Sequence, residues 1–156
     1  MTQPIDEKRD LVLSKDLAAT PAQIWAAWSS PELLATWWAP VPFKTEVQKM
    51  ELVTGGAFDT AMSGPNGEHF AGRGLFLEVV PQQRIVFTDT LEEGYRPGKE
   101  PFMTAIITLE PLETGTRYTA LVRHKDEETC KKHEEMGFFP GWGTVMDQLE
   151  QVAQGL

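Results

Sequence analysis

Apolar and polar residues alternate at the start of the chain and then change to a helical spacing. Residues 11–17 alternate well enough to predict a β-strand. Thr20-Pro21 has the form of a helix N-cap followed by proline at the first helical position, where a missing N–H costs nothing. Ser30-Pro31 repeats this signal and predicts a second short helix, which ends before Pro40 and Pro42. The chain is therefore expected to begin with a strand and two short helices.

Strand signals replace the helical spacing in the middle of the chain. Asn66-Gly67 predicts a tight hairpin turn, because both residues tolerate the positive φ angles that such turns need. Gly72 and Gly74 lie inside a long apolar segment and are expected to mark a bulge or bend. Strands are expected at residues 45–52, 57–62, 70–80, 84–91, 102–110 and 116–123.

The last segment returns to helix. Residues 126–136 are very polar, and a better helix is expected from about Phe139 to Gln154, after an interruption at Pro140. Its apolar residues form one stripe that would lie against a flat surface: Trp142, Val145, Met146, Leu149, Val152 and Ala153. Antiparallel strands flanked by helices predict an α+β domain with the helices on one face of the sheet. Since no linker or repeat interrupts the pattern, residues 1–156 are expected to form one domain, with a core at about 11–154.

Composition and charge restrict the partners of this domain. The formal net charge of −9 repels phosphate groups, so neither nucleic acid nor an anionic membrane surface is expected as a partner. The single cysteine, Cys130, allows no internal disulfide and fits a reducing compartment. The polar first ten residues do not resemble a signal peptide, and no apolar run is long enough to span a membrane. A cytoplasmic location is expected.

Tryptophan is concentrated near both ends of the chain. Four of the five tryptophans lie between residues 17 and 40, and the fifth is Trp142. This distribution indicates that the two ends build one apolar interior. Whether that interior is only a core or also a pocket stays open, because cores and ligand pockets use the same residue types.

Several motifs together resemble a known family. The first part of the chain carries Thr20-Pro21, Ile24-Trp25, Trp28, Ser30-Pro31-Glu32-Leu33 and Trp37-Trp38. Further matches follow in order at Gly55-Gly56, Asn66-Gly67-Glu68, Leu77-Glu78-Val79 with Pro81, Arg84-Ile85-Val86-Phe87-Thr88, and Gly141-Trp142-Gly143. Over about residues 11–149, the chain resembles a bacterial single-domain member of the activator-of-heat-shock-protein-90-ATPase homologue group, which belongs to the START-like (SRPBCC) superfamily.

The resemblance implies a helix-grip fold, in which a curved antiparallel sheet wraps around a long C-terminal helix. Members of the superfamily keep a cavity between helix and sheet, where they bind lipids, sterols, hormones or polyketides, and some catalyse cyclisation or aromatisation. The eukaryotic co-chaperones of the group have a further N-terminal domain that engages the chaperone, and this chain has no room for one. The resemblance therefore favours ligand binding over chaperone activation.

The first functional hypothesis is that the domain binds a small or medium hydrophobic molecule between the sheet and the C-terminal helix. The alternative for each tryptophan is ordinary packing in the core. Burial of apolar surface would supply affinity, and Asp89 or Tyr118 would set the orientation of the molecule. The expected lining consists of Trp25, Trp28, Trp38, Phe58, Phe76, Phe87, Asp89, Met103, Tyr118, Trp142 and Met146.

Two other hypotheses remain. Alternation with Ile85 and Phe87 would turn Asp89 inward, where it could act with Tyr118 as the acid and base of a cyclase-like or hydrolase-like enzyme. The alternative for Asp89 is a strand-end residue that caps a turn or meets a basic side chain. The third hypothesis is a stress-linked or chaperone-linked interaction domain, which would need a contiguous exposed apolar patch.

Metal and cofactor chemistry is not expected. His69, His124 and His133 are scattered and the spacing does not bring them together. Cys130 and His133 could lie on one side of a helix, but a metal site needs three or four protein ligands. If the protein associates, a two-fold homodimer is the expected form.

Overall fold

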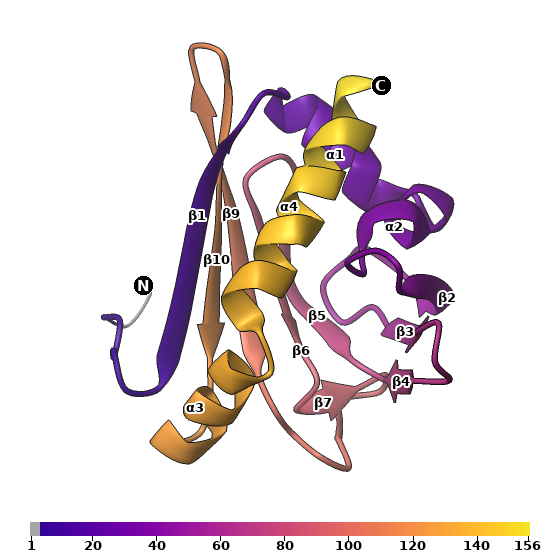
Figure 1. Cartoon of the computed structure of the whole chain (residues 1–156), viewed down its shortest axis with the longest axis vertical. Coiled ribbons are helices and arrows are strands. Elements are labelled where there is room, and N and C mark those ends of the chain that lie inside the picture. The colour runs from indigo at the N-terminus through magenta and orange to yellow at the C-terminus, as the bar shows by residue number, and fades with distance from the viewer. Residues whose placement is uncertain (1–3) are drawn as a thin grey trace.

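A five-stranded antiparallel sheet forms the larger layer of the protein (Figure 1). The computed structural model describes residues 4–156. The pairing of the outer strand with its neighbour, and of that neighbour with the next strand, runs without a register shift, so this side of the sheet is regular. In sheet order the strands are β1 (Asp10–Leu17), β10 (Gly115–Arg123), β9 (Thr104–Leu112), β6 (Arg84–Thr88) and β5 (Leu75–Val80).

A smaller antiparallel sheet adjoins the β5 edge. It contains β2 (Lys44–Met50), β3 (Phe58–Ser63) and β4 (His69–Gly72), in that order. An isolated bridge between Ala57 and Leu75 links it to the larger sheet. The two-residue strands β7 (Leu91–Glu92) and β8 (Arg96–Pro97) form a short ribbon in the loop that follows β6.

The prediction of a single strand over residues 70–80 is wrong, because this segment forms two strands in different sheets. The break falls at Gly74, whose backbone is in close contact with two other strands: a Cβ here would lie 2.7 Å from the Thr88 carbonyl oxygen and 3.2 Å from that of Phe58. The Gly74 carbonyl also accepts a hydrogen bond from the Phe58 amide at 3.0 Å. Glycine therefore allows the backbone to leave one sheet and enter the other.

The two short helices begin as their caps predict. Helix α1 (Pro21–Ser29) has a complete capping box, in which the Thr20 hydroxyl accepts from the Gln23 amide and the Gln23 side chain accepts from the Thr20 amide. Helix α2 (Pro31–Trp37) is capped by Ser30, whose hydroxyl accepts from the Leu33 amide. Both signals are local, which is why the sequence predicts them correctly.

The C-terminal segment forms α3 (Glu127–Glu135) and the long helix α4 (Phe138–Gln154). Helix α4 begins one residue before the expected start, and Pro140 lies in its first turn, where a proline needs no N–H partner. Figure 1 shows α4 crossing one face of the larger sheet, with α1 beside its C-terminal end and α3 near its N-terminal end. The expected α+β helix-grip fold is confirmed.

Hydrogen bonds fix the C-terminal end of α4 to the loop after β1. The Ala18 amide donates to the Glu150 carboxylate at 2.7 Å, and the Gln154 side chain donates to the Ala18 carbonyl at 3.1 Å. The helix extends from this end over the sheet, where Lys15 of β1 donates to the Gly143 carbonyl at 3.3 Å and to the Asp147 carboxylate at 2.7 Å. Within residues 4–156, no helix is both long and apolar enough to cross a membrane.

Candidate functional site

Aromatic rings fill the interior beneath α1 and α2. Trp28 is fully buried, and its ring centroid lies 5.4 Å from that of Trp37 and 5.3 Å from that of Trp38. The ring centroids of Phe58 and Phe87 lie 6.2 and 6.1 Å from that of Trp28, both in tilted arrangements. Such pairs add packing energy beyond the burial of area. This end of the interior is therefore a packed aromatic cluster.

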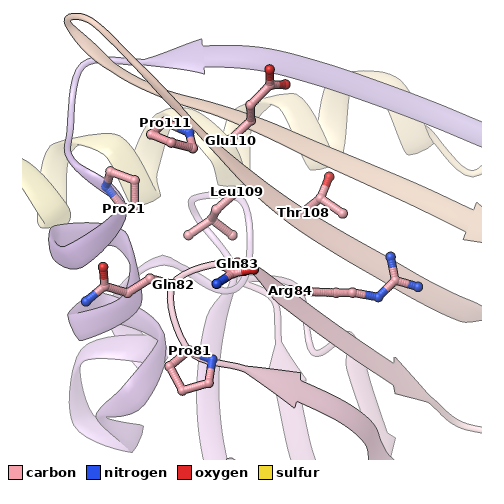
Figure 2. Close-up of a pocket in the computed structure, with 9 residues that line it drawn as sticks. All are labelled: Pro21, Pro81, Gln82, Gln83, Arg84, Thr108, Leu109, Glu110 and Pro111. Atoms are coloured by element: carbon pink, nitrogen blue, oxygen red, sulfur yellow. The ribbon is translucent and has the colours of Figure 1, made fainter.

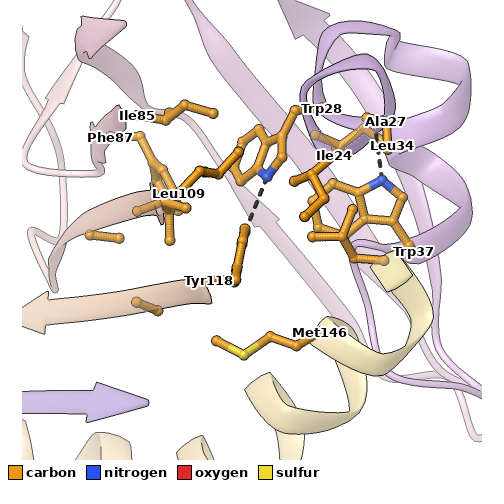
Figure 3. Packing of buried hydrophobic residues seen from close by; sticks show 14 of the residues in the cluster. Ile24, Ala27, Trp28, Leu34, Trp37, Ile85, Phe87, Leu109, Tyr118 and Met146 are labelled. Carbon is orange, nitrogen blue, oxygen red and sulfur yellow. Dashed lines mark hydrogen bonds between the residues drawn. The ribbon is translucent and has the colours of Figure 1, made fainter. Parts of the chain in front are cut away.

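Tyr118 brings one polar atom into this cluster. Its hydroxyl accepts a hydrogen bond from Trp28 Nε1 at 3.1 Å, and Met146 of α4 lies on its other side (Figure 3). Burial raises the pKa of the Tyr118 phenol, so the group stays neutral. The hydroxyl proton has no acceptor among residues 4–156, which leaves one hydrogen-bond donor unused inside the interior.

Asp89 lies in the bend directly after β6 and fixes the far end of the following loop. Its Oδ1 accepts hydrogen bonds from the amides of Phe102 and Met103, at 2.9 and 3.0 Å. This is the turn-capping arrangement that the sequence left open as an alternative. The carboxylate holds the loop of residues 90–101 closed at its base.

The opposite end of the interior contains a pair of histidines that the sequence analysis did not bring together. His124 Nε2 and His133 Nδ1 are 2.8 Å apart, and His124 Nδ1 lies 2.9 Å from the Arg9 carbonyl oxygen. Both rings are largely buried. His133 is three residues after Cys130 on the buried side of α3, and this shared helix face was the available signal.

Three aromatic rings surround His133. The ring centroids of Phe102, Phe138 and Trp142 lie 4.8, 5.1 and 6.2 Å from that of His133. Phe138 and Trp142 belong to the first two turns of α4, and their centroids are 5.0 Å apart. The fifth tryptophan therefore belongs to a second aromatic group, here called the histidine end of the interior.

The residues expected to line a cavity divide into two classes by exposure. Those that are buried are Trp28, Phe58, Phe76, Phe87, Tyr118 and Met146. Those that stay partly exposed are Trp25, Trp38, Asp89, Met103 and Trp142. The apolar members of the second class pack against the core without being covered by it.

A hollow of about 580 Å³ lies at another place on the molecule, and Figure 2 shows the side chains that line it. It lies between the turn after β5, the end of β9 and the start of α1, and contains none of the residues expected to line a ligand cavity. Its one basic residue, Arg84, is paired with Glu78 at 3.1 Å. The lining is Pro21, Pro81, Gln82, Gln83, Arg84, Thr108, Leu109, Glu110 and Pro111.

The described residues include no group of three or more histidine, cysteine, aspartate or glutamate side chains placed to hold a metal ion. Cys130 is buried, and burial raises the pKa of its thiol, so the neutral form predominates. Its place in the fold is therefore that of a small apolar side chain beneath α3.

The sequence matches a known protein family along most of its length. The model described as Activator of Hsp90 ATPase homolog 1-like protein matches residues 18–154. The chain belongs to this family. The match covers most of the sequence and includes the two capped helices, every strand after β1, and α4, which confirms the resemblance found from the motifs.

Solved structures of similar proteins have the same fold. A crystal structure of a protein from Nitrosomonas europaea is 41% identical, with a TM-score of 0.92 and 97% of each chain covered. A protein from Mycobacterium smegmatis is 25% identical, with a TM-score of 0.80, covering 94% of this chain and 91% of that one. An AHSA1-like protein from Aeromonas hydrophila, at 18% identity and a TM-score of 0.70, covers 94% and 92% and supports the fold alone. The comparison with curated proteins found no match.

Proposed function

We propose that this family member binds a small or medium hydrophobic molecule between the larger sheet and α4. The observation that carries the proposal is the set of large apolar side chains left partly exposed around the core. Met103 precedes β9 on the sheet side, and Trp142 and Val145 belong to α4. Ligand sites are lined mostly by apolar and aromatic side chains with a few polar groups, and this set supplies side chains of that kind.

Tyr118 supplies a polar contact for such a molecule. Its hydroxyl proton lacks an acceptor among the described residues, and a buried unused donor costs about 1–3 kcal/mol. A carbonyl or ether oxygen on the ligand would remove this cost. We therefore expect the ligand to carry an acceptor on the part that reaches Tyr118.

Apolar burial sets the scale of the affinity. A two-ring molecule that buries roughly 300 Å² would gain about 7 kcal/mol at about 25 cal/mol per Å². Part of this gain is lost to immobilisation of the ligand and of nearby side chains. Since the full gain would correspond to a dissociation constant of about 10 μM, affinity in the high-micromolar to millimolar range is the expected result.

The test uses the methyl ether of β-naphthol as an apolar probe. Calorimetry should detect binding, and saturating probe should raise the melting temperature of the protein. Met103→Trp should fill the proposed space and weaken binding at least about tenfold, whereas Met136→Trp, at an exposed methionine, should leave binding unchanged. Absence of binding to the unmodified protein, or equal binding by the two variants, would contradict the proposal.

A further inference from the structure

The hydrogen bonds of the histidine pair define which nitrogens carry protons. The Arg9 carbonyl oxygen can only accept, so His124 Nδ1, 2.9 Å away, must be the donor. In the neutral ring His124 Nε2 is then an acceptor, and His133 Nδ1, 2.8 Å away, must carry the next proton. Both hydrogen bonds therefore form when each neutral ring carries its proton on Nδ1.

With the His133 proton on Nδ1, the free lone pair of the ring lies on Nε2. That atom has no hydrogen-bond partner among residues 4–156. It is not fully enclosed either, because within that range the Thr45 hydroxyl is the one enclosed polar side-chain atom without a partner. His133 thus presents a fixed acceptor at the histidine end of the interior.

The surroundings of His133 are aromatic. Phe102, Phe138 and Trp142 lie within 4.8–6.2 Å of its ring, measured between centroids. Planar apolar molecules pack well against such rings, and a neutral acceptor among them favours a neutral donor. Trp142 is also one of the partly exposed residues that support the proposed ligand site.

We propose that His133 Nε2 accepts a hydrogen bond from the hydroxyl group of a phenolic or similar aromatic alcohol, whose ring packs beside Phe102 and Trp142. The inference rests on the proposed function and names the chemical class of its ligand. The hydroxyl end lies at the histidine end of the interior, and the apolar remainder extends along α4 toward Met146. From Trp142 to Met146 the helix rises about 6 Å, roughly the length of one further ring.

The electrostatics favour binding over acid–base chemistry at this atom. Burial lowers the pKa of His133 to about 4, so its ring is neutral near pH 7. An imidazole of this basicity accepts a hydrogen bond but removes a proton from an alcohol poorly. Its role is to orient the hydroxyl group.

Nuclear magnetic resonance of the unmodified protein tests the proton order directly. Long-range ¹H–¹⁵N spectra at about pH 7.5, where histidine is mostly neutral, should show both His124 and His133 protonated at Nδ1. Addition of β-naphthol should then move the His133 Nε2 resonance, and its methyl ether should not. A proton on His133 Nε2, or equal shifts with both probes, would overturn the proposal.

Binding measurements give the second test. Calorimetry should show β-naphthol binding about five- to tenfold more tightly than its methyl ether, as expected for one buried hydrogen bond. His133→Phe keeps an aromatic ring and should abolish this preference. His69→Phe, the same change at an exposed histidine of β4, should preserve it.

The outcomes separate this inference from the proposed function. If neither probe binds, both proposals fail. If the ether binds but the unmodified protein shows no preference for the alcohol, ligand binding stands and the role of His133 is wrong. If the preference survives in His133→Phe, a water molecule or another group satisfies the hydroxyl, and the assignment is again wrong.

Discussion

At the scale of single residues, the Tyr118 hydroxyl provides the hydrogen-bond acceptor for the buried indole N–H of Trp28. Tyr118→Phe would leave the indole N–H of fully buried Trp28 without an acceptor. The same change removes the unused hydroxyl donor, which offsets part of this cost, so we expect a net loss of about 1 kcal/mol in the free energy of unfolding, measured by urea denaturation. Tyr95→Phe is the matched control, because Tyr95 is exposed and should show almost no change. Equal effects of the two substitutions would contradict this account.

Asp89 permits a second test at this scale. Asp89→Ala removes the acceptor for the Phe102 and Met103 amides and should cost about 1–2 kcal/mol in urea denaturation. Asp89→Asn keeps one side-chain oxygen and should recover most of the loss. Asp147→Ala breaks an exposed ion pair with Lys15 and should cost less than about 1 kcal/mol. If Asp147→Ala lost as much stability as Asp89→Ala, the result would argue against a special role for Asp89.

His133 links stability to pH. Its pKa is lowered to about 4 in the folded protein, against about 6.5 in an unfolded chain, so the unfolded state binds more protons between these values. Stability should therefore fall as pH falls through this window, with about 2 kcal/mol lost between about pH 7 and pH 5. His133→Phe should lose less over the same range, and urea denaturation at both pH values measures the difference. Parallel pH profiles for the two proteins would refute the assignment.

At the scale of elements, prediction succeeded where the signal was local and failed where it depended on another segment. The starts of α1 and α2 follow from Thr20-Pro21 and Ser30-Pro31, whose caps involve residues three positions away. The break at Gly74 depends on the Thr88 and Phe58 carbonyls, which only the folded sheet brings near. The histidine pair likewise joins the residue after β10 to a residue of α3, a meeting that no periodicity encodes.

The break between β4 and β5 leads to a prediction about two neighbouring glycines. Gly74→Ala would place a Cβ 2.7 Å from the Thr88 carbonyl oxygen and should cost about 2 kcal/mol or more. Gly72→Ala meets no atom within 4 Å and should change stability by less than about 0.5 kcal/mol. Chemical denaturation of both variants compares them within one short segment. Similar losses would show that strand propensity, and not close approach, explains the glycine at 74.

At the scale of the whole molecule, the two aromatic groups lie at different ends of one continuous core. Trp28 and Trp37 report on the α1–α2 end, and Trp142 reports on the histidine end. Because the sheet and α4 span both ends, we expect a single cooperative unfolding transition. Fluorescence of Trp142→Phe, which keeps the tryptophans of the first end, should give the same midpoint as far-ultraviolet circular dichroism. Separate midpoints would show that the ends unfold independently.

The close packing of Trp28, Trp37 and Trp38 also has an optical consequence. Their centroids are 5.3–5.5 Å apart and their ring planes are steeply inclined to one another. Chromophores held this way couple their electronic transitions, so the native protein should show an exciton couplet in its circular dichroism. The couplet would disappear as soon as side-chain packing loosens, even while helices and strands persist. The circular dichroism of the three indoles should therefore report directly on whether the side chains of the core are tightly packed.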